Sequence, residues 1–353
     1  MDYKNFNKKK ILITGHTGFK GSWLSLWLHM LGGKIIGVSN NIPTSPSHYK
    51  LFKNIYLDDL RGDIANLKFI NNTINNHKPD YIFHFAAQSL VLPSYKDPYN
   101  TYKSNTIGTL NILESLKQSN HDCVAVMITS DKCYENIDQV VNYKESDRLG
   151  GSDPYSTSKS SAELIIRGYN NSFFQSDSSR ILIASARAGN VIGGGDWAAN
   201  RIVPDCIRSW SDNKKVILRN PDSTRPWQHV LEPINGYLSL ASAMRDNPKL
   251  SSESFNFGPT NNTSFTVKDL VSELAKCFET AQWDINIDHN NLHEHKLLSL
   301  DCEKAIKLLN FKSKLDFKLT AKWTGDWYNY FYKSQSQDII KISKKQIDNF
   351  LSL

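Results

Sequence analysis

The stretch GHTGFKGSWL, residues 15–24, decides the fold, because it places three glycines between a short apolar run and a helix-like segment. Gly15, Gly18 and Gly21 follow the run ILIT at residues 11–14. Glycines make such a turn tight and let the backbone approach a ligand, while the free amides at a helix start attract negative charge. This spacing between a strand and a helix is typical of a loop that binds a dinucleotide pyrophosphate.

Outward from this loop, short apolar runs alternate with amphipathic segments as far as about residue 188. The runs are KILITG (10–15), KIIGVS (34–39), NIYLDD (54–59), DYIFHFAA (80–87), CVAVMITS (123–130) and RILIASAR (180–187). Such alternation is typical of a parallel sheet covered by helices on both faces. The sequence therefore predicts an α/β fold, a Rossmann-type doubly wound parallel sheet. In its first helix, Trp23, Trp27, Met30 and Leu31 recur at helical spacing and are expected in the core.

The end of the second predicted strand bears on the choice of cofactor. About twenty residues past Gly21, an Asp or Glu would normally bind the adenosine ribose of NAD, but this chain has Asn40 and Asn41 there. An asparagine can still hydrogen-bond a ribose hydroxyl, and no arginine stands there to meet a 2′-phosphate. The pattern favours NAD over NADP.

The texture of the chain predicts its domain organisation. After about residue 190, segments rich in Gly, Pro and Trp replace the regular alternation, as in GGGDWAANRIVPD at residues 193–205. Irregular segments near the carboxyl ends of strands are where such a fold holds its substrate. We expect an NAD-binding Rossmann domain at 1–188 and a mainly substrate-binding, smaller C-terminal region at 189–335. Segments around 228–258 are expected to return to the Rossmann domain, and 336–353 are expected to form a C-terminal tail.

Bulk composition narrows the function classes. The chain has 353 residues and a formal net charge of +7, which could favour an anionic ligand, but its charges are spread rather than clustered into a stripe that would bind nucleic acid. Five scattered cysteines without a CxxC pair predict reduced thiols, with neither a disulfide framework nor a metal site. Only four apolar residues follow the basic N-terminus, and no run approaches the ~18 of a membrane span. We expect a cytoplasmic protein that does not contact membranes.

The stretch DPYSTSK, residues 153–159, predicts the start of a second functional helix. Asp153 is a good N-cap and Pro154 a good first helical residue, so Tyr155 and Lys159 are expected one turn apart on one face. A phenol titrates near pH ~10, and Lys159 together with an oxidised nicotinamide could lower that pKa. Tyr155 is therefore a candidate base for a hydroxyl proton, although an isolated YxxxK also occurs by chance on helix surfaces.

The stretch VMITSDKCYEN, residues 126–136, brings polar residues to the carboxyl end of a buried strand. Ligands bind at this edge of an open α/β sheet, so Ser130, Asp131 and Lys132 are candidate catalytic residues. Asp131 and Lys132 could instead form an ion pair that caps the strand. Cys133 is expected to be a packing residue, since no histidine partner lies nearby in the sequence.

Taken together, the motifs resemble one branch of the extended short-chain dehydrogenase/reductase superfamily, the CDP-glucose 4,6-dehydratases. The similarity runs from about residue 9 to about residue 332. The stretches that carry it are GHTGFKGSWL (15–24), HFAAQSLV (84–91), TSDKCYEN (129–136), DPYSTSK (153–159), SARAGNVIGGGDW (185–197), RIVPDCIR (201–208) and RPWQHVLEP (225–233). The first of these and SDKCY are features of this branch that sugar epimerases do not share.

The resemblance implies that NAD is the cofactor and that CDP-glucose is converted to CDP-4-keto-6-deoxyglucose. Tyr155, its phenolate favoured by Lys159, would take the proton of the glucose 4-hydroxyl while hydride moves from carbon 4 to NAD. The 4-ketone would acidify the proton on carbon 5, water would leave across carbons 5 and 6, and the hydride would return to carbon 6. The resemblance also implies a homo-oligomer, dimer or tetramer, that serves deoxysugar biosynthesis for lipopolysaccharide O-antigen.

The resemblance assigns roles to the residues after the fifth strand run, with one substitution. Related dehydratases carry Thr-Asp-Glu where this chain has Ser130-Asp131-Lys132. By position, Ser130 would hydrogen-bond the 4-oxygen, Asp131 would protonate the departing 6-hydroxyl, and Lys132 stands where relatives have the glutamate base for carbon 5. A lysine is a base only when its pKa is depressed, and as a cation it could only stabilise an enolate. The identity of the carbon 5 base is left open.

The resemblance further implies two sets of binding residues. Those expected around NAD are Gly15, His16, Gly18, Phe19, Lys20, Gly21, Asp63, Ile64, Ala86, Ala87, Gln88, Asn105, Tyr155 and Lys159. Asn190, Arg201 and Arg225 are expected to bind the substrate pyrophosphate and cytidine, because a planar guanidinium can engage phosphate oxygens in a fork. Each arginine could instead be a surface salt-bridge partner.

Two other functions fit parts of the pattern. A nucleotide-sugar 4-epimerase would keep the glycine loop, Tyr155 and Lys159, but it needs no acid to expel a 6-hydroxyl, so Asp131 argues against it. A non-catalytic NAD-binding protein on the same fold usually lacks the Tyr-Lys pair, which is intact here.

Overall fold

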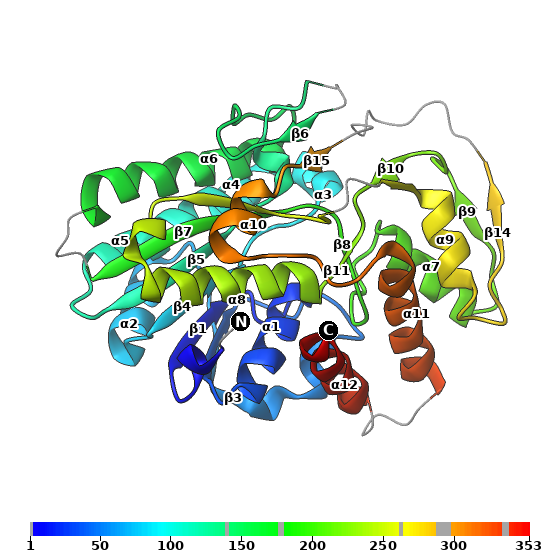
Figure 1. Cartoon of the computed structure of the whole chain (residues 1–353), viewed down its shortest axis with the longest axis horizontal. Helices are drawn as coiled ribbons and strands as arrows, with labels where there is room; N and C mark the ends of the chain where they lie inside the picture. The colour runs from blue at the N-terminus through cyan, green and yellow to red at the C-terminus, as the bar shows by residue number, and fades with distance from the viewer. Residues whose placement is uncertain (1–2, 138–140, 176–179, 261–263, 287–297, 334–338) are drawn as a thin grey trace.

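A seven-stranded parallel sheet forms the centre of the protein (Figure 1). The computed structural model describes residues 3–137, 141–175, 180–260, 264–286, 298–333 and 339–353. The strand order is β3-β2-β1-β4-β5-β7-β12, and every neighbouring pair is parallel. The strands are β1 (Lys10–Thr14), β2 (Lys34–Ser39), β3 (Tyr56–Arg61), β4 (Tyr81–His84), β5 (Cys123–Ile128), β7 (Ile181–Ala188) and β12 (Ser254–Phe257). All six apolar runs predicted from the sequence lie in this sheet, which confirms the doubly wound α/β fold.

Helices cover both faces of the sheet, because its strands carry apolar side chains on both sides. Ile11 and Ile13 of β1 pack on one face with α1 and α8, whereas Leu12 packs on the other face with α2, α5 and α6. The helices are α1 (Phe19–Met30), α2 (Leu67–His77), α3 (Val91–Lys96), α4 (Pro98–Tyr102), α5 (Gly108–Lys117), α6 (Pro154–Tyr169), α7 (Ile202–Ser211), α8 (Leu231–Asp246), α9 (Val267–Ala275), α10 (Glu303–Leu309), α11 (Phe317–Lys333) and α12 (Ile339–Ser352). Burial on both faces is what parallel sheets require.

The apolar stripe of α1 lies in the core, as its spacing predicts. Trp23 and Trp27 are fully buried, and Met30 and Leu31 are partly buried against the same cluster. The Trp23 indole nitrogen donates to Gly194 O at 2.8 Å, which ties α1 to the GGGDW segment. The helix that begins in the glycine loop is thereby fixed both to the sheet and to the C-terminal region.

The C-terminal region adds short elements beside the sheet, and Figure 1 shows α7, α9, β9 and β14 grouped to one side of it. Its two-stranded sheets pair β8 (Val191–Ile192) with β11 (Gln228–His229), β9 (Val216–Leu218) with β14 (Trp283–Ile285), β10 (Thr224–Arg225) with β13 (Phe265–Thr266), and β6 (Asn142–Tyr143) with β15 (Ser299–Leu300). Between these elements, α8 and β12 return to the central sheet. The predicted domain limits themselves stay a prediction.

The last described element, α12, packs back onto the N-terminal half. Ile347 and Phe350 are fully buried, and the Phe350 ring lies 5.6 Å from that of Trp27. Within the predicted tail, residues 336–338 lie outside the described part of the chain. None of the helices in the described ranges combines the length and apolarity needed to cross a membrane.

Candidate active site

Two positions of the glycine loop, Gly15 and Gly21, have no room for a side chain. Gly15 has φ +76°, and a Cβ there would lie 2.7 Å from the Ala86 nitrogen. A Cβ on Gly21 would lie 2.2 Å from Gly15 O. Gly18 is the N-cap of α1 and no side chain caps it, so the first turn of the helix offers its amides to an anion. The loop at the end of β1 therefore fits the pyrophosphate of a dinucleotide.

His16, the second residue of the loop, is turned into the protein. Its ring is fully buried, with Nδ1 3.0 Å from Ser39 Oγ and Nε2 2.8 Å from Asp59 Oδ1. A Cβ on Gly37 would lie 2.5 Å from the same ring. Burial lowers the pKa of His16, although Asp59 opposes the shift. The side chain ties the loop to β2 and β3, and Asp59 is a partner that the sequence analysis did not anticipate.

The loop after β4 is fastened to α6 through Asn105. Asn105 Oδ1 accepts from Gln88 N at 2.7 Å, while Nδ2 donates to Gln88 O at 2.9 Å and to Ser158 Oγ at 2.8 Å. The Ala86 amide donates to Thr14 Oγ1 at 3.2 Å, which holds Ala87 and Gln88 beside the glycine loop. The structure thus brings this predicted part of the cofactor site together.

Asp63 and Ile64, after β3, are placed differently from each other. Asp63 is exposed, and its Oδ2 lies 3.3 Å from Lys103 Nζ. Ile64 is buried under α5, where Gly108 leaves room for it, and its carbonyl accepts from Asn111 Nδ2 at 2.9 Å. The side chain of Ile64 belongs to the core, so only its backbone and Asp63 border the cofactor side of the sheet.

The predicted helix start at residue 154 is confirmed. Asp153 is the N-cap of α6 and accepts from Ser156 N at 3.0 Å, with Pro154 in the first turn. Tyr155 and Lys159 follow one turn apart, and only 7% and 6% of their surfaces are exposed. Lys159 Nζ donates to Ile128 O, the last residue of β5, at 3.5 Å. The pair is therefore held at the carboxyl edge of the sheet.

Ser130, Asp131 and Lys132 lie directly opposite this pair. The Ser130 hydroxyl donates to Asp131 Oδ1 at 2.9 Å, accepts from Lys132 N at 3.2 Å, and shares a hydrogen bond with the Tyr155 phenol. Asp131 Oδ2 is buried without a hydrogen-bond partner among the described residues. Lys132 Nζ lies 3.8 Å from that oxygen, close enough for an ion pair but too far for a hydrogen bond. The ion pair that the sequence offered as the alternative role of these two residues is therefore present, although Asp131 Oδ2 receives no hydrogen bond from the described residues.

Burial shifts the pKa values of both Tyr155 and Lys159. It raises the pKa of Tyr155 to about 12, with Asp131 and Asp153 adding to the rise while Ser130 and Arg201 oppose it. Burial lowers the pKa of Lys159 to about 8. Removal from water thus disfavours the charged form of each group. That Lys159 and an oxidised nicotinamide together lower the Tyr155 pKa stays a prediction.

Two charged groups of the cluster were not placed there by sequence reasoning. Lys20 was expected only at the cofactor, yet its charge interacts with those of Arg201, Asp131 and Lys159. Burial lowers the Lys20 pKa to about 8. Asp196 was not singled out, although its carboxylate pairs with Arg201 at 2.8 Å. The Asp in the GGGDW segment, five residues before an arginine, was the available signal.

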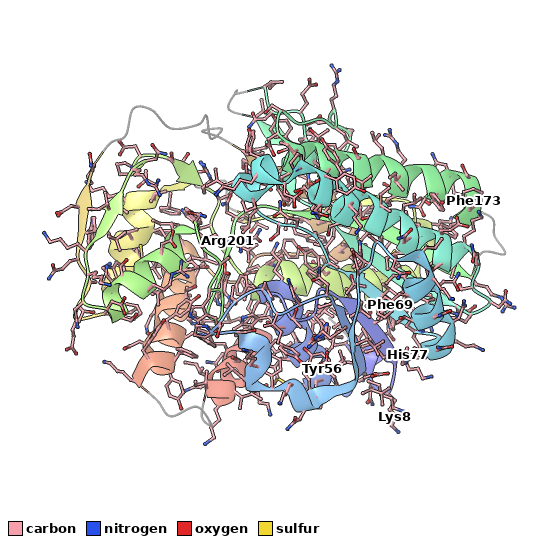
Figure 2. All side chains as sticks on the ribbon, turned by 180° about the vertical axis from the view of Figure 1, so that it is seen from behind. Lys8, Tyr56, Phe69, His77, Phe173 and Arg201 are labelled. Atoms are coloured by element: carbon pink, nitrogen blue, oxygen red, sulfur yellow. The ribbon has the colours of Figure 1, made fainter. Side chains whose placement is uncertain are left out.

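The three residues predicted to bind the substrate, Asn190, Arg201 and Arg225, lie in the segments that follow β7. Arg201 is placed between the sheet and the C-terminal group of elements in Figure 2, and its charge also acts on Tyr155. The Asn190 carbonyl accepts from Gln228 N at 3.2 Å, which joins the β8 and β11 segments. Arg225 is buried on β10, and its Nη1 donates to Thr224 O at 2.8 Å.

The cysteines are placed as packing residues. All five are free thiols, and Cys133 is fully buried in the turn that follows β5. Burial raises the Cys133 pKa well above its ordinary value, which disfavours the thiolate that a nucleophile needs. Across the described ranges, no three His, Cys, Asp or Glu side chains lie close enough together to share a metal ion.

Comparisons with known proteins show which family and fold the chain shares. The family model for GDP-mannose 4,6 dehydratase matches residues 12–324. CDP-glucose 4,6-dehydratase of Salmonella typhimurium is 42% identical over 99% of this chain and 98% of its own length. An epimerase structure from Methanothermobacter thermautotrophicus has a TM-score of 0.79 at 21% identity, covering 97% of this chain and 96% of that one.

A dehydratase structure shares the fold as well. dTDP-glucose 4,6-dehydratase of Bacillus anthracis, solved in complex with NAD, has a TM-score of 0.73 at 22% identity and covers 91% of this chain and 96% of that one. These structural similarities establish the fold. The 42% identity to CDP-glucose 4,6-dehydratase over nearly the whole chain narrows the choice of family. The chain belongs to the nucleotide-sugar 4,6-dehydratase family of extended short-chain dehydrogenases/reductases.

Proposed function

We propose that this protein converts CDP-glucose to CDP-4-keto-6-deoxyglucose with NAD as its cofactor. The observation that carries the proposal is the cluster of Tyr155, Ser130 and Asp131 at the sheet edge, in which one buried Asp131 oxygen receives no hydrogen bond from the described residues. The 42% identity to a CDP-glucose 4,6-dehydratase along nearly the whole chain supports the choice of sugar and nucleotide. Bound NAD would accept a hydride from the sugar and return it within the same turnover.

The first half-reaction needs a group that takes the proton of the sugar 4-hydroxyl. Tyr155 is that base, and Ser130, which shares a hydrogen bond with the phenol, orients the 4-oxygen. Because burial raises the Tyr155 pKa, proton transfer depends on nearby positive charge. Arg201 supplies such charge, and Lys159 lies one turn away from Tyr155 on the same helix.

The second half-reaction needs an acid and a base. Asp131 delivers a proton to the departing 6-hydroxyl through Oδ2, which receives no hydrogen bond from the described residues. Lys132, on the same turn with Nζ 3.8 Å from that oxygen, is one candidate to take the proton from carbon 5. Lys20 is the alternative base, since its pKa of about 8 leaves part of it neutral near physiological pH.

The substrate nucleotide is anchored by the C-terminal residues. Arg201 is held by Asp196 at 2.8 Å, so its guanidinium is preorganised for a phosphate oxygen. Arg225 and Asn190 border the same region and bind the remaining pyrophosphate and cytidine groups. Asp63, the loop from Ala86 and the glycine loop surround NAD, while the His16 side chain braces that loop from behind.

The setting of the reaction follows from the same proposal. We place the enzyme in the cytoplasm as a homo-oligomer, dimer or tetramer, that contacts neither membranes nor nucleic acid. Its product serves deoxysugar biosynthesis for lipopolysaccharide O-antigen.

A 4-epimerase is the rival activity, because proteins such as UDP-glucose 4-epimerase of Mycoplasma pneumoniae are 24% identical over 92% of this chain. An epimerase inverts carbon 4 and has no use for an acid at the 6-hydroxyl, which Asp131 would provide. The test is to incubate the protein with NAD and nucleotide-glucoses and to examine the products by mass. Loss of one water from CDP-glucose supports the dehydratase, and an isomer of unchanged mass that separates from the substrate by chromatography supports the epimerase.

A further inference from the structure

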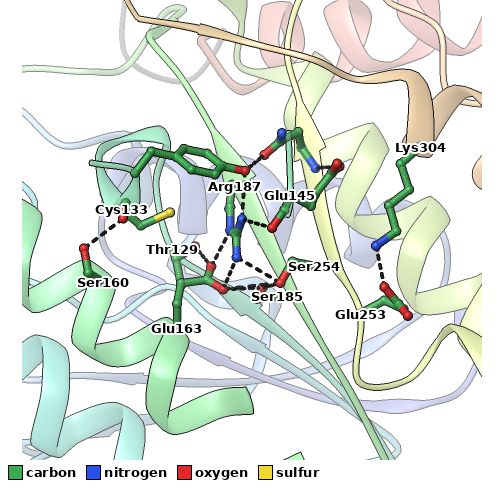
Figure 3. Close-up of polar contacts among 12 residues, drawn as sticks. Thr129, Cys133, Glu145, Ser160, Glu163, Ser185, Arg187, Glu253, Ser254 and Lys304 are labelled. Atoms are coloured by element: carbon green, nitrogen blue, oxygen red, sulfur yellow. Dashed lines mark hydrogen bonds and ion pairs between the residues drawn. The ribbon is translucent and has the colours of Figure 1, made fainter. Parts of the chain in front are cut away.

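The turn at residues 129–134 carries Ser130, Asp131 and Lys132, the proposed catalytic residues. Both of its ends are attached to one buried ion pair, which Figure 3 shows. Glu163 and Arg187 meet through two contacts, Nη2 to Oε2 at 2.7 Å and Nε to Oε1 at 3.0 Å. Thr129, immediately before Ser130, donates its hydroxyl to Glu163 Oε1. Tyr134, two residues after Lys132, accepts from Arg187 Nη1 at 2.8 Å. The segment 129–134 is therefore attached at one end to the carboxylate and at the other to the guanidinium.

The pair also joins elements that are far apart in the sequence. Glu163 lies on α6, one turn after Lys159, and Arg187 lies on β7. The Tyr134 hydroxyl donates to Asn256 Oδ1 at 2.7 Å, which extends the network to β12. Ser160 of α6 adds a further bond to the turn, from its hydroxyl to Cys133 O at 2.8 Å.

The Glu163–Arg187 pair is buried. Only 3% of the Arg187 side chain and 2% of the Glu163 side chain are exposed. Burial opposes ionisation of Glu163, but Arg187 and the hydroxyls of Thr129 and Ser185 outweigh it and hold the pKa below its usual value. A buried ion pair adds little stability over apolar residues of the same shape. We therefore expect this pair to matter for the geometry of the site.

We propose that the Glu163–Arg187 pair, acting through Thr129 and the Tyr134 hydroxyl, is a positioning device that holds Ser130, Asp131 and Lys132 in register with Tyr155 and Lys159. The inference rests on the proposed function, since it assigns no group that touches the substrate. It makes the two half-reactions depend on one geometry, because the base and the acid stand on the two segments that the pair joins. Small displacements of reacting groups cost large factors in rate.

Tyr134→Phe is the main test, because it removes one hydroxyl and keeps the ring. The variant leaves Arg187 and Asn256 each short of one bond but does not strand a charge. The matched control is Tyr143→Phe. The Tyr143 ring stacks on Tyr134 with centroids 5.1 Å apart, but its hydroxyl accepts from Ile137 N at 3.1 Å and does not bind the pair.

The kinetic readout separates positioning from general loss of stability. We expect Tyr134→Phe to lower kcat by about tenfold or more, with KM for CDP-glucose and NAD affinity changed less than about twofold. Tyr143→Phe should keep kcat near the parent value. Rates are expressed per folded active site, counted by NAD binding, so that partial unfolding does not mimic the effect.

Hydrogen exchange gives a readout that needs no substrate. The amides of Lys132 and Cys133 donate within the turn, at 3.2 Å to Ser130 Oγ and 3.2 Å to Ser130 O. In Tyr134→Phe these amides should exchange at least about tenfold faster while those in the middle of α6 are unchanged, since the turn opens locally. If the wild-type protein dehydrates none of the nucleotide-glucoses, the proposed function fails. The hydrogen-exchange measurement still decides whether the pair positions the turn.

A double variant removes the pair without leaving a lone charge. Single variants such as Glu163→Gln leave Arg187 uncompensated and risk misfolding, whereas Glu163→Gln with Arg187→Met replaces both charges by side chains of similar shape. We expect this double variant to fold and to lose turnover by about a hundredfold. A folded double variant with parent turnover, or unchanged exchange and kcat in Tyr134→Phe, would overturn the inference.

Discussion

Tyr155 and Lys159 lie one turn apart on α6, and burial moves their pKa values apart, up to about 12 for the phenol and down to about 8 for the ammonium. Both shifts disfavour the charged forms that proton abstraction needs. The groups that counteract the rise at Tyr155 are the Ser130 hydroxyl and the Arg201 guanidinium. The phenol therefore needs positive charge around it, such as that of Arg201, to act as a base.

Tyr155→Phe removes the proton acceptor while keeping the ring. General-base catalysis contributes about 10²–10⁴-fold, so we expect turnover to fall by about that factor with little change in NAD affinity. Steady-state rates and NAD titration measure the two quantities. Tyr169→Phe is the matched control on the same helix, since its hydroxyl donates to Glu114 at 2.9 Å near the far end. Parent turnover in Tyr155→Phe would remove this residue from the mechanism.

Asp131→Asn separates oxidation from elimination. The amide keeps the shape but cannot deliver a proton to the 6-hydroxyl, while Tyr155 and Lys159 are untouched. We expect a bound NADH signal in single turnover that persists while dehydrated product forms slowly. Product at the parent rate would refute the acid role, and a folded variant that never reduces NAD would place Asp131 in the first half-reaction.

Lys132→Met and Lys20→Met distinguish the two candidate bases for carbon 5. We expect Lys132→Met to retain oxidation at carbon 4 but to slow elimination and solvent exchange at carbon 5 by about 10²–10⁴-fold. Lys20→Met should slow both half-reactions, because the Lys20 charge interacts with those of Lys159, Arg201 and Asp131. Normal carbon 5 exchange in Lys132→Met, together with its loss in Lys20→Met, would transfer the base role to Lys20.

Glu232 makes the stability of the fold depend on pH. Its Oε1 accepts from the amides of Lys314 and Leu315 at 2.8 and 2.7 Å, and burial raises its pKa to about 7 despite these bonds and the Lys314 charge. The folded pKa exceeds the unfolded value, so the folded state binds more protons between about pH 4.5 and 7, and stability falls as pH rises through this window.

The measurement is thermal or urea unfolding of Glu232→Gln against wild type. The free energies of unfolding of the two proteins should be closest near pH 5. By pH 8 the variant should gain on the order of 3 kcal/mol relative to wild type, because the Glu232 pKa rises from 4.5 to about 7 on folding. Glu273→Gln, on a surface ion pair with Lys276 at 2.7 Å, is the matched control. A stability difference that stays constant from pH 5 to 8 would contradict the assignment.

The sequence was sufficient where the signal is local. The apolar runs predicted the sheet because parallel strands are buried on both faces, and Gly15 and Gly21 stand where only a glycine fits. Asp153 and Pro154 set the start of α6, so the spacing of Tyr155 and Lys159 followed directly.

Features that depend on contacts between residues far apart in the sequence could not be predicted from it. Asp59 meets His16 across 43 residues, and Arg187 meets Glu163 across 24, with no spacing rule to announce either pair. The rise in the Tyr155 pKa follows from burial, which the whole fold determines. The binding roles of Asn190, Arg201 and Arg225 stay predictions.

The central claim is that the protein dehydrates CDP-glucose while its cofactor is restored in each turnover. The most direct test incubates the purified protein with NAD and CDP-glucose, beside UDP-, dTDP- and GDP-glucose, and follows sugar-nucleotide mass and NADH absorbance together. We predict that CDP-glucose loses one water in preference to the other substrates, with no net NADH. Stoichiometric NADH without a dehydrated sugar would contradict the account and indicate a simple dehydrogenase.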